Sequence, residues 1–257
     1  LNDRSDSKNG TIICLEGPPG VGKTTIAKKI AKALGRKFER ISLGGMKDAS
    51  ELKGHRRTYV GAMAGKIVKA ISKSKCENPV ILLDEIDKVS AQFNKSDIDS
   101  VLLEVLDPEQ NKQFQDNYME LPIDLSKVLF ISTANSLSDI SPPLQDRMEI
   151  IHLDSYTEEE KVIIAQKYLI PDLLKEFKIK KKDFVLTKSM IKFIVDQYTQ
   201  ESGVRTLRSH LKKILAHKEK CRIFNEESKV TKEVVDELLF DHFNHKEEKA
   251  KTGVGET

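Results

Sequence analysis

A glycine-rich run that ends in a lysine and a threonine lies near the start of the chain. It is Gly17-Pro18-Pro19-Gly20-Val21-Gly22-Lys23-Thr24, followed by Thr25. Glycines let backbone N–H groups turn toward phosphate oxygens, and a helix that begins near Lys23 directs its positive end at the same anion. In this pattern the lysine reaches the β- and γ-phosphates, and the Thr24 hydroxyl ligates Mg²⁺. The run therefore predicts binding of ATP or ADP with Mg²⁺ and disfavours a turn that binds nothing.

Two acidic residues, Asp84 and Glu85, follow an apolar run that is typical of a buried strand. We expect Asp84 to bind the nucleotide's Mg²⁺ through its water shell and Glu85 to activate the attacking water as a general base. An acidic pair at the end of a strand is otherwise a common turn. Because a phosphate loop is predicted on the neighbouring strand, we favour hydrolysis.

Asn135 is a third polar residue at the end of a predicted strand. In an open α/β sheet, polar residues beyond the carboxyl ends of the strands line the ligand crevice. Asn135 is therefore expected to orient the attacking water against the γ-phosphate. Taken alone, it is more typical of an asparagine in a strand-to-loop turn.

Five short apolar runs are predicted to form the strands that position these side chains. Several are apolar without alternation, as parallel strands covered on both faces require. Helical patterns lie between the runs, so the sequence predicts an α/β fold with a five-stranded parallel sheet between helices. The predicted strands are Thr11–Leu15, Phe38–Ser42, Val80–Asp84, Val128–Thr133 and Glu149–Leu153.

The strand pattern ends after Leu153, and helical patterns replace it. Thr157 and Glu160 have the spacing of a capping box, which begins a helix that Pro171 is expected to interrupt. Further apolar stripes at helical spacing follow. We expect a polar tail over 1–10, an α/β nucleotide-binding domain over 11–155, a small all-α lid domain over 156–244 and a linker over 245–257. Both ends look cut, which suggests a segment of a longer protein.

Charge and composition argue against several classes of protein. Lys and Arg number 43 against 40 Asp and Glu, a net charge of +3, so nucleic acid is not indicated as the main partner. No apolar stretch approaches the ~20 residues of a membrane span. Cys14, Cys76 and Cys221 are scattered without metal-ligand spacing, which fits a reducing compartment.

Taken together, these motifs resemble those of the AAA+ ATPases. The resemblance rests on Gly17–Thr24, Asp84-Glu85, Asn135, Arg147 and a helical domain that contains Arg205. Longer strings narrow it to the ATPase module of the Lon proteases, and it extends from about Gly10 to Asp241. Those strings are Ile41–Gly45, Gly54–Met63, Leu102–Asn111, Asp124–Phe130 and Asp146–Glu149.

The resemblance implies catalytic roles for two arginines. Arg147 matches the arginine finger, which reaches the γ-phosphate held by the next subunit of a ring and raises turnover by ~10³–10⁵. Arg205 matches the sensor of the helical domain, which contacts the nucleotide and couples it to domain closure. Without the resemblance, both would be interpreted as surface or helix-end arginines.

The resemblance also implies that Tyr59 and Val60 lie on a loop in the central pore of a hexameric ring, where they contact unfolded protein. An aromatic ring can contact any polypeptide through its area, and Gly61 and Gly65 would let the loop move. From the residues alone, a tyrosine that caps the core is an equal alternative. A second loop around Phe114–Tyr118 is also expected to face the pore.

By resemblance, the chain is an ATP-hydrolysing motor module of a Lon-type protease that unfolds and translocates protein substrates. Nothing after Asp241 supplies the ~100–200 residues of a peptidase domain, so no peptide cleavage is expected of this chain. The alternatives are a nucleic-acid-directed ring ATPase and a nucleotide switch without turnover. The family implies a mitochondrial matrix or a bacterial cytoplasm, and the segment Glu77–Pro79 favours the first. No membrane partner is expected.

Overall fold

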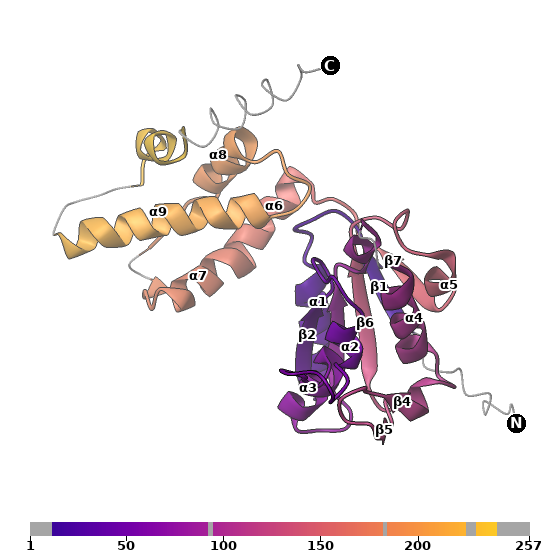
Figure 1. Ribbon diagram of the computed structural model, residues 1–257. Helices are drawn as coiled ribbons and strands as arrows, with labels where there is room; N and C mark the ends of the chain where they lie inside the picture. Colours follow the sequence, from indigo (N-terminus) through magenta and orange to yellow (C-terminus); the bar gives the residue numbers. More distant parts are fainter. Residues whose placement is uncertain (1–11, 92–94, 182–183, 225–229, 241–257) are drawn as a thin grey trace, which may run out of the picture. The chain divides into compact units, whose positions relative to one another are not determined.

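The computed structural model describes residues 12–91, 95–181, 184–224 and 230–240. They fall into two compact units, coloured along the chain in Figure 1. Of the described residues, the first unit contains 12–18 together with those of Gly22–Asp154, and the second contains Pro19–Val21 together with those from Ser155 to 240. The predicted tail over 1–10, Thr11 and the stretch 241–257, with the predicted linker, lie outside the described residues.

The first unit is built on a five-stranded parallel sheet with the order β2-β3-β6-β1-β7. The predicted parallel sheet is therefore confirmed. The expectation that the strand before the phosphate loop neighbours the strand of Asp84 is corrected, because β6 lies between β1 and β3. Three strands are shifted by one residue from their predicted bounds because pairing decides where each ends; Glu16, for example, pairs with both Ala134 and His152. The strands are β1 (Ile12–Glu16), β2 (Phe38–Ser42), β3 (Val80–Asp84), β6 (Leu129–Ala134) and β7 (Met148–His152).

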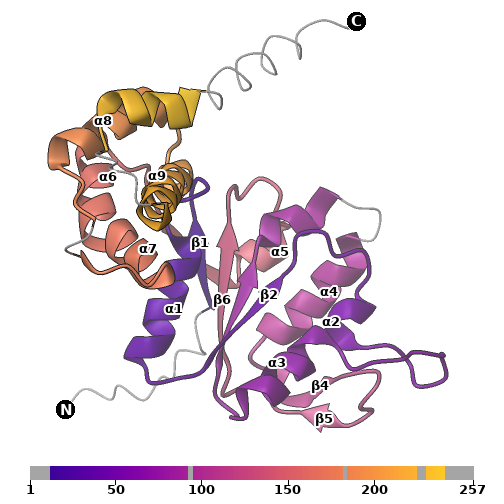
Figure 2. The same ribbon diagram turned by 90° about the vertical axis from the view of Figure 1, so that its left-hand side faces the viewer.

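Helices cover both faces of this sheet, as Figure 2 shows. On one face, α1 (Lys23–Ala33) packs its buried alanines against Val80 and Leu82 of β3. On the other face, α3 (Lys66–Ser74), α4 (Lys95–Leu106) and α5 (Pro142–Gln145) share a larger core with Ile81 and Leu83. Successive side chains of a strand point to opposite faces, so a strand covered on both sides is apolar throughout.

Several short elements of this unit were not predicted. They are α2 (Ser50–Lys53), η1 (Ile86–Ala91), η2 (Asn111–Gln113), β4 (Phe114–Gln115) and β5 (Pro122–Ile123). The strands β4 and β5 pair antiparallel as a small hairpin. Two residues per strand are too few to give a periodic pattern in the sequence.

The second unit is helical and has its own apolar core. The predicted capping box is confirmed, because Thr157 Oγ1 accepts from Glu160 N at 3.2 Å and Glu160 Oε2 accepts from Thr157 N at 2.9 Å. The prediction that Pro171 interrupts the helix is corrected. Here α6 (Glu158–Ile164) passes through a π-helical turn, η3 (Ala165–Leu169), directly into α7 (Ile170–Glu176). Pro171, the second residue of α7, directly follows the π-helical turn, so the regular α-helical hydrogen bonding changes where the proline is placed.

The remaining helices of this unit are α8 (Lys188–Tyr198), α9 (Arg205–Ile223) and a stretch over 232–240. Apolar side chains of α7, α8 and α9 meet in the core of the unit. Within the described part of the chain, no helix combines the length and the apolar character needed to cross a bilayer.

Candidate functional site

The glycine-rich loop connects β1 to α1. Its glycines, Gly17, Gly20 and Gly22, have φ values of 151°, 87° and 95°, a backbone region that residues with a Cβ rarely adopt. Gly22 is the N-cap of α1 and offers no side-chain acceptor. The N–H groups of the first helical turn have no partner within the helix, so they remain available to an anion. The loop therefore fits a phosphate group.

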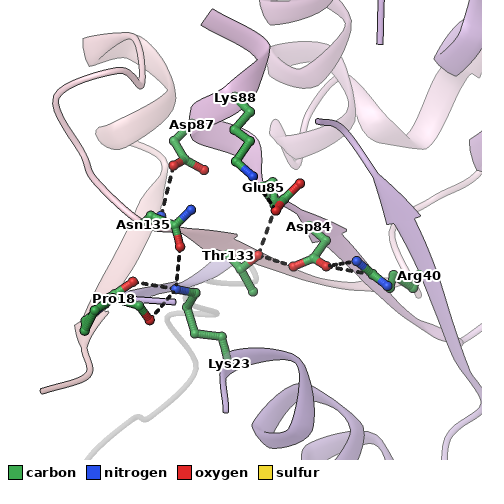
Figure 3. A network of polar contacts seen from close by, with 10 residues as sticks. Pro18, Lys23, Arg40, Asp84, Glu85, Asp87, Lys88, Thr133 and Asn135 are labelled. Carbon is green, nitrogen blue, oxygen red and sulfur yellow. Dashed lines mark hydrogen bonds and ion pairs between the residues drawn. The ribbon is translucent and has the colours of Figure 1, made fainter. Parts of the chain in front are cut away.

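Lys23 directs its ammonium group into this loop (Figure 3). Its Nζ donates to Gly17 O, to Pro18 O at 3.0 Å and to Asn135 Oδ1 at 2.9 Å. Burial lowers the pKa of Lys23, and the nearby carboxylates of Asp87 and Asp84 act in the opposite direction. A partly desolvated ammonium gains more from an anion than one in water does. The structure thus brings together Lys23 and Asn135, two of the predicted site residues.

The carboxylate of Asp84 ends β3 and is held on both oxygens. Arg40 donates to Oδ2 from Nε and Nη2, each at 2.6 Å, and Thr133 Oγ1 donates to Oδ1. The same Thr133 oxygen accepts from Glu85 N at 3.0 Å. Thr133 therefore positions both acidic residues, and neither it nor Arg40 was predicted from the sequence. The available signal was the alignment of predicted strands, since β2, β3 and β6 are neighbours in a parallel sheet.

Glu85 has an unusual backbone conformation, with φ at 62° although it is not glycine. Such a conformation costs on the order of 1–3 kcal/mol and is concentrated at functional sites. Its carboxylate accepts from Lys88 Nζ at 2.6 Å. A Cβ on Gly44 would lie 2.5 Å from Glu85 Oε2, so the glycine leaves room for this carboxylate.

Asp87, the first-turn acid of η1, is a further polar residue that was not predicted. It is 7% exposed, and its Oδ2 accepts from Asn135 N at 3.1 Å. Its other oxygen, Oδ1, is buried and has no hydrogen-bond partner among the described residues. An unpaired buried carboxylate oxygen near Lys23 is costly, so it indicates a site that accepts further polar groups.

The residues present also fit a magnesium ion. Thr24 lies in the first turn of α1 and Asp84 at the end of β3. In the described part of the chain, no three or more His, Cys, Asp or Glu side chains form a group that could hold a metal. Mg²⁺ usually binds through one or two protein oxygens, with water and phosphate oxygens completing its shell. Thr24, together with Asp84 through water, matches that preference.

Arg147 is not part of the network in Figure 3. Its Nη2 lies 3.2 Å from Asp107 Oδ2, and its Nη1 donates to Pro143 O at 3.1 Å. The N–H of Glu109 and, after it, the Arg147 guanidinium hold the pKa of Asp107 below its ordinary value. The side chain of Arg147 is 34% exposed, so it is partly accessible from outside this unit.

Arg205 is the first residue of α9 and is exposed. The second unit includes the loop segment Pro19–Val21, and there Val204 N donates to Gly20 O at 3.2 Å. A Cβ on Gly20 would lie 3.3 Å from Arg205 Cβ. The start of α9 therefore lies beside Gly20 of the predicted phosphate loop.

Tyr59 and Val60 lie in the connection between α2 and α3. Tyr59 is 66% exposed and Val60 is fully exposed, so the alternative that Tyr59 caps the core is wrong. The expectation for Phe114 is corrected, because that ring is completely buried in the core of the first unit. Phe114 begins β4, where its side chain points inward; of the residues after it in this stretch, Gln115 and Asn117 are exposed, Tyr118 is half-buried and Asp116 is buried.

Comparisons with known proteins agree with this geometry. Residues 13–155 match the family model described as ATPase family associated with various cellular activities (AAA). Residues 175–237 match the model of the Lon protease AAA+ ATPase lid domain.

Several bacterial proteins are similar to this chain. Lon protease of Fusobacterium nucleatum is 54% identical over 205 residues, which are 80% of this chain and 27% of that protein. Lon protease of Clostridioides difficile is 54% identical over 208 residues, 81% of this chain and 26% of that protein. Lon protease 1 of Bacillus subtilis is 53% identical over 225 residues, 88% of this chain and 29% of that protein.

The chain thus spans little more than a quarter of the length of these relatives. Because they are bacterial, they give no support to the mitochondrial matrix expected from Glu77–Pro79. The AAA match covers more than half of the chain and includes β1 to β7 with the phosphate loop. The chain therefore belongs to the AAA family of ATPases.

Proposed function

We propose that this chain is the ATP-hydrolysing motor module of a Lon-type protease, which couples hydrolysis to the unfolding and translocation of protein substrates. One observation carries the proposal. The contact of Lys23 with Asn135 and the contacts of Thr133 with Asp84 and Glu85 lie close together at the carboxyl ends of β3 and β6, next to a loop shaped for phosphate. The lid-domain match and the Lon protease relatives support the assignment to this branch of the family.

In this proposal the loop N–H groups and Lys23 bind the β- and γ-phosphates. Thr24 and, through water, Asp84 would hold Mg²⁺, which would supply positive charge that stabilises the phosphates. Glu85 accepts the proton of the attacking water, and Asn135 orients that water. Binding and proton transfer thus come from different residues of the same sheet edge, so they can be separated by substitution.

Two further residues would complete the site during turnover. Arg147 would reach the γ-phosphate of a neighbouring subunit in a hexameric ring, for which its partial exposure leaves it accessible. Arg205 would respond to the nucleotide from the helical unit, where it already lies beside Gly20. The first of these roles requires Arg147 to leave or share its present contacts with Asp107 and Pro143.

The protein substrate would contact Tyr59 and Val60. Both side chains are exposed in the connection between α2 and α3, where an aromatic and a branched apolar group lie next to each other in the chain. Contact through ring area does not depend on the substrate's sequence. The bacterial origin of the relatives favours the bacterial cytoplasm over the mitochondrial matrix as the place of action.

The proposal is tested by calorimetric titration of the chain with ATP, with Mg²⁺ and with a chelator. Lys23→Ala should weaken Mg²⁺-dependent uptake by on the order of tenfold to a hundredfold, because a charge-assisted contact is lost. Lys32→Ala, at an exposed lysine of the same helix, is the matched control. Equal uptake by the unmodified chain and Lys23→Ala would overturn the assigned phosphate site.

Hydrolysis is tested separately with Glu85→Gln. This variant should retain ATP uptake and lose phosphate release by ~10²–10⁴-fold, because the amide cannot accept the proton. Unchanged release would refute the assigned base, and no release from the unmodified chain at any concentration would favour the nucleotide switch. Salt-dependent retention of DNA on filters would favour the nucleic-acid-directed alternative.

A further inference from the structure

A buried carboxylate lies between two surface loops of the first unit. Asp116, in the turn between β4 and β5, is 0% exposed. Its Oδ2 accepts from Gly65 N at 2.7 Å, and its Oδ1 accepts from Tyr118 N at 2.9 Å and Met119 N at 3.0 Å. One side chain thus holds its own turn and the far end of the connection between α2 and α3.

The next residue holds the near end of that connection. Asn117 N donates to Lys53 O at 2.7 Å, and Asn117 Nδ2 donates to Gly54 O at 3.1 Å. We call residues 54–65 the Tyr59 loop and residues 116–121 the hairpin loop. Asp116 and Asn117 together bind both ends of the Tyr59 loop to the hairpin loop.

The glycines at the two ends allow this close approach. Gly54 has φ at 82°, and a Cβ there would lie 2.6 Å from Asp116 Oδ1. A Cβ on Gly65 would lie 1.9 Å from Leu52 O. A side chain at Gly54 would push the Tyr59 loop away from Asp116 of the hairpin loop. One at Gly65 would instead push apart the two ends of the Tyr59 loop, which Asp116 and Asn117 hold together.

Both loops expose apolar side chains beyond this joint. The Tyr59 loop exposes Tyr59, Val60 and Met63, and the hairpin loop exposes Met119 and Leu121. Figure 2 shows the connection between α2 and α3 extending from the unit on the side of β4 and β5. Arg57, whose guanidinium lies 5.4 Å from the centre of the Tyr118 ring, makes a second link between the loops.

We propose that Asp116 and Asn117 are positioning residues that make the two loops move as one body, with a joint apolar surface for unfolded protein. The inference rests on the proposed function for its substrate, but the mechanical link stands on the hydrogen bonds alone. A substrate held by Tyr59 would then also meet Met119 and Leu121. Neither Asp116 nor Asn117 touches the network around Lys23, so hydrolysis without protein substrate should not depend on them.

The link is tested by hydrogen exchange of the chain. Asp116→Asn replaces one acceptor with a donor, and Asn117→Ala removes the bond to Gly54 O while leaving the backbone bond to Lys53. Each variant should speed exchange in both loops together, by on the order of tenfold. Asp124→Asn is the matched control, because Asp124 Oδ1 accepts from Ser126 N at 2.8 Å within a single turn. If the Tyr59 loop keeps its exchange rate while the hairpin loop loosens, the joint does not exist.

The functional consequence is tested in the full-length protein with a reduced, alkylated unfolded protein as the probe. Asn117→Ala should leave hydrolysis without the probe unchanged and raise the half-saturating probe concentration at least about threefold, with little change in the maximal stimulated rate. If the loops loosen and the half-saturating concentration stays the same, the joint surface is refuted while the motor assignment stands. If the unmodified protein binds no Mg²⁺–ATP, the motor assignment fails, and the exchange result still decides the link. Should Asp116→Asn fail to fold, Asn117→Ala alone decides both questions.

Discussion

Lys88 Nζ lies 2.6 Å from Glu85 Oε1, so the proposed general base is ion-paired within its own chain. The two residues are three positions apart, and η1 begins between them at Ile86. Their side chains are 51% and 37% exposed, respectively, which makes this a partly solvated pair. On the other side of the carboxylate, Gly44 leaves space for Oε2. Lys88 therefore biases the direction in which Glu85 points.

Lys88→Gln should raise the rate of hydrolysis modestly. Exposed ion pairs contribute about 0.2–1 kcal/mol, so releasing Glu85 should increase kcat by no more than about fivefold. Nucleotide affinity should not change. Lys127→Gln, which breaks the exposed pair with Glu77, is the control for a general charge effect. A fall in kcat of more than about tenfold would mean that Lys88 itself assists the reaction.

Thr133→Val should separate hydrolysis from binding. The hydroxyl donates to Asp84 and accepts from Glu85 N, and valine has the same shape without these bonds. Because the site is buried, the unfolding free energy should fall by about 1–3 kcal/mol. Phosphate release should fall more than ATP uptake, since Glu85 loses its backbone anchor. Thr133→Ser restores the hydroxyl and should recover both quantities; equal loss in the serine variant would contradict the role of the hydroxyl.

Hydrolysis per molecule should rise with protein concentration. Arg147 contacts Asp107 and Pro143 and is not part of the network around Lys23. Its proposed role at a γ-phosphate therefore requires the nucleotide of a neighbouring subunit. Arg147→Ala should abolish the rise and lower the assembled rate by ~10³–10⁵. Arg208→Ala, which breaks an exposed pair with Glu176, is the matched control. Sedimentation at the same concentrations shows whether assembly occurs; assembly with a flat rate would remove the finger assignment.

Tyr59→Ala, made in the full-length protein, should spare ATP hydrolysis and stop the degradation of folded substrates. The ring is 66% exposed and packs no core, so its removal should not change the unfolding free energy by more than about 0.5 kcal/mol. Tyr168→Ala removes a similarly exposed tyrosine of the helical unit, 52% exposed, and should leave degradation intact. Normal degradation by the Tyr59 variant would remove its substrate role.

The sequence was sufficient to predict the sheet and the phosphate loop for physical reasons. A strand buried on both faces must be apolar throughout, as in Val80–Leu83. A simple glycine-rich turn would not account for Lys23 and Thr24 at the start of a helix, whereas a phosphate-binding loop does. The observed ends of three strands differ by one residue from the predicted ends. The reason is that strand ends depend on the pairing partners, which the local sequence pattern does not reveal.

The rest of the site depends on contacts between residues far apart in the chain. Thr133 meets Asp84 only because β3 and β6 are neighbours, and Arg40 meets it from β2. Phe114 was assigned to a surface loop because two-residue strands give no periodic signal, and it is buried. Asp116 was not predicted because its partner Gly65 is 51 positions away in the sequence, and no local pattern relates the two residues.

The stability of the helical unit should fall at alkaline pH through one tyrosine. Burial and a hydrogen bond from its hydroxyl to Asp236 raise the pKa of Tyr198 from 10.0 to about 12. A raised pKa means that the folded state favours the neutral phenol, so this contribution is complete below pH 10 and is lost as the pH rises toward 12. Near pH 8, the unmodified chain should be about 1 kcal/mol more stable than Tyr198→Phe. In urea unfolding followed across this range, that difference should shrink above pH 10. A difference that stays constant across the range would show that the Tyr198 hydroxyl is not selectively stabilised in the folded state.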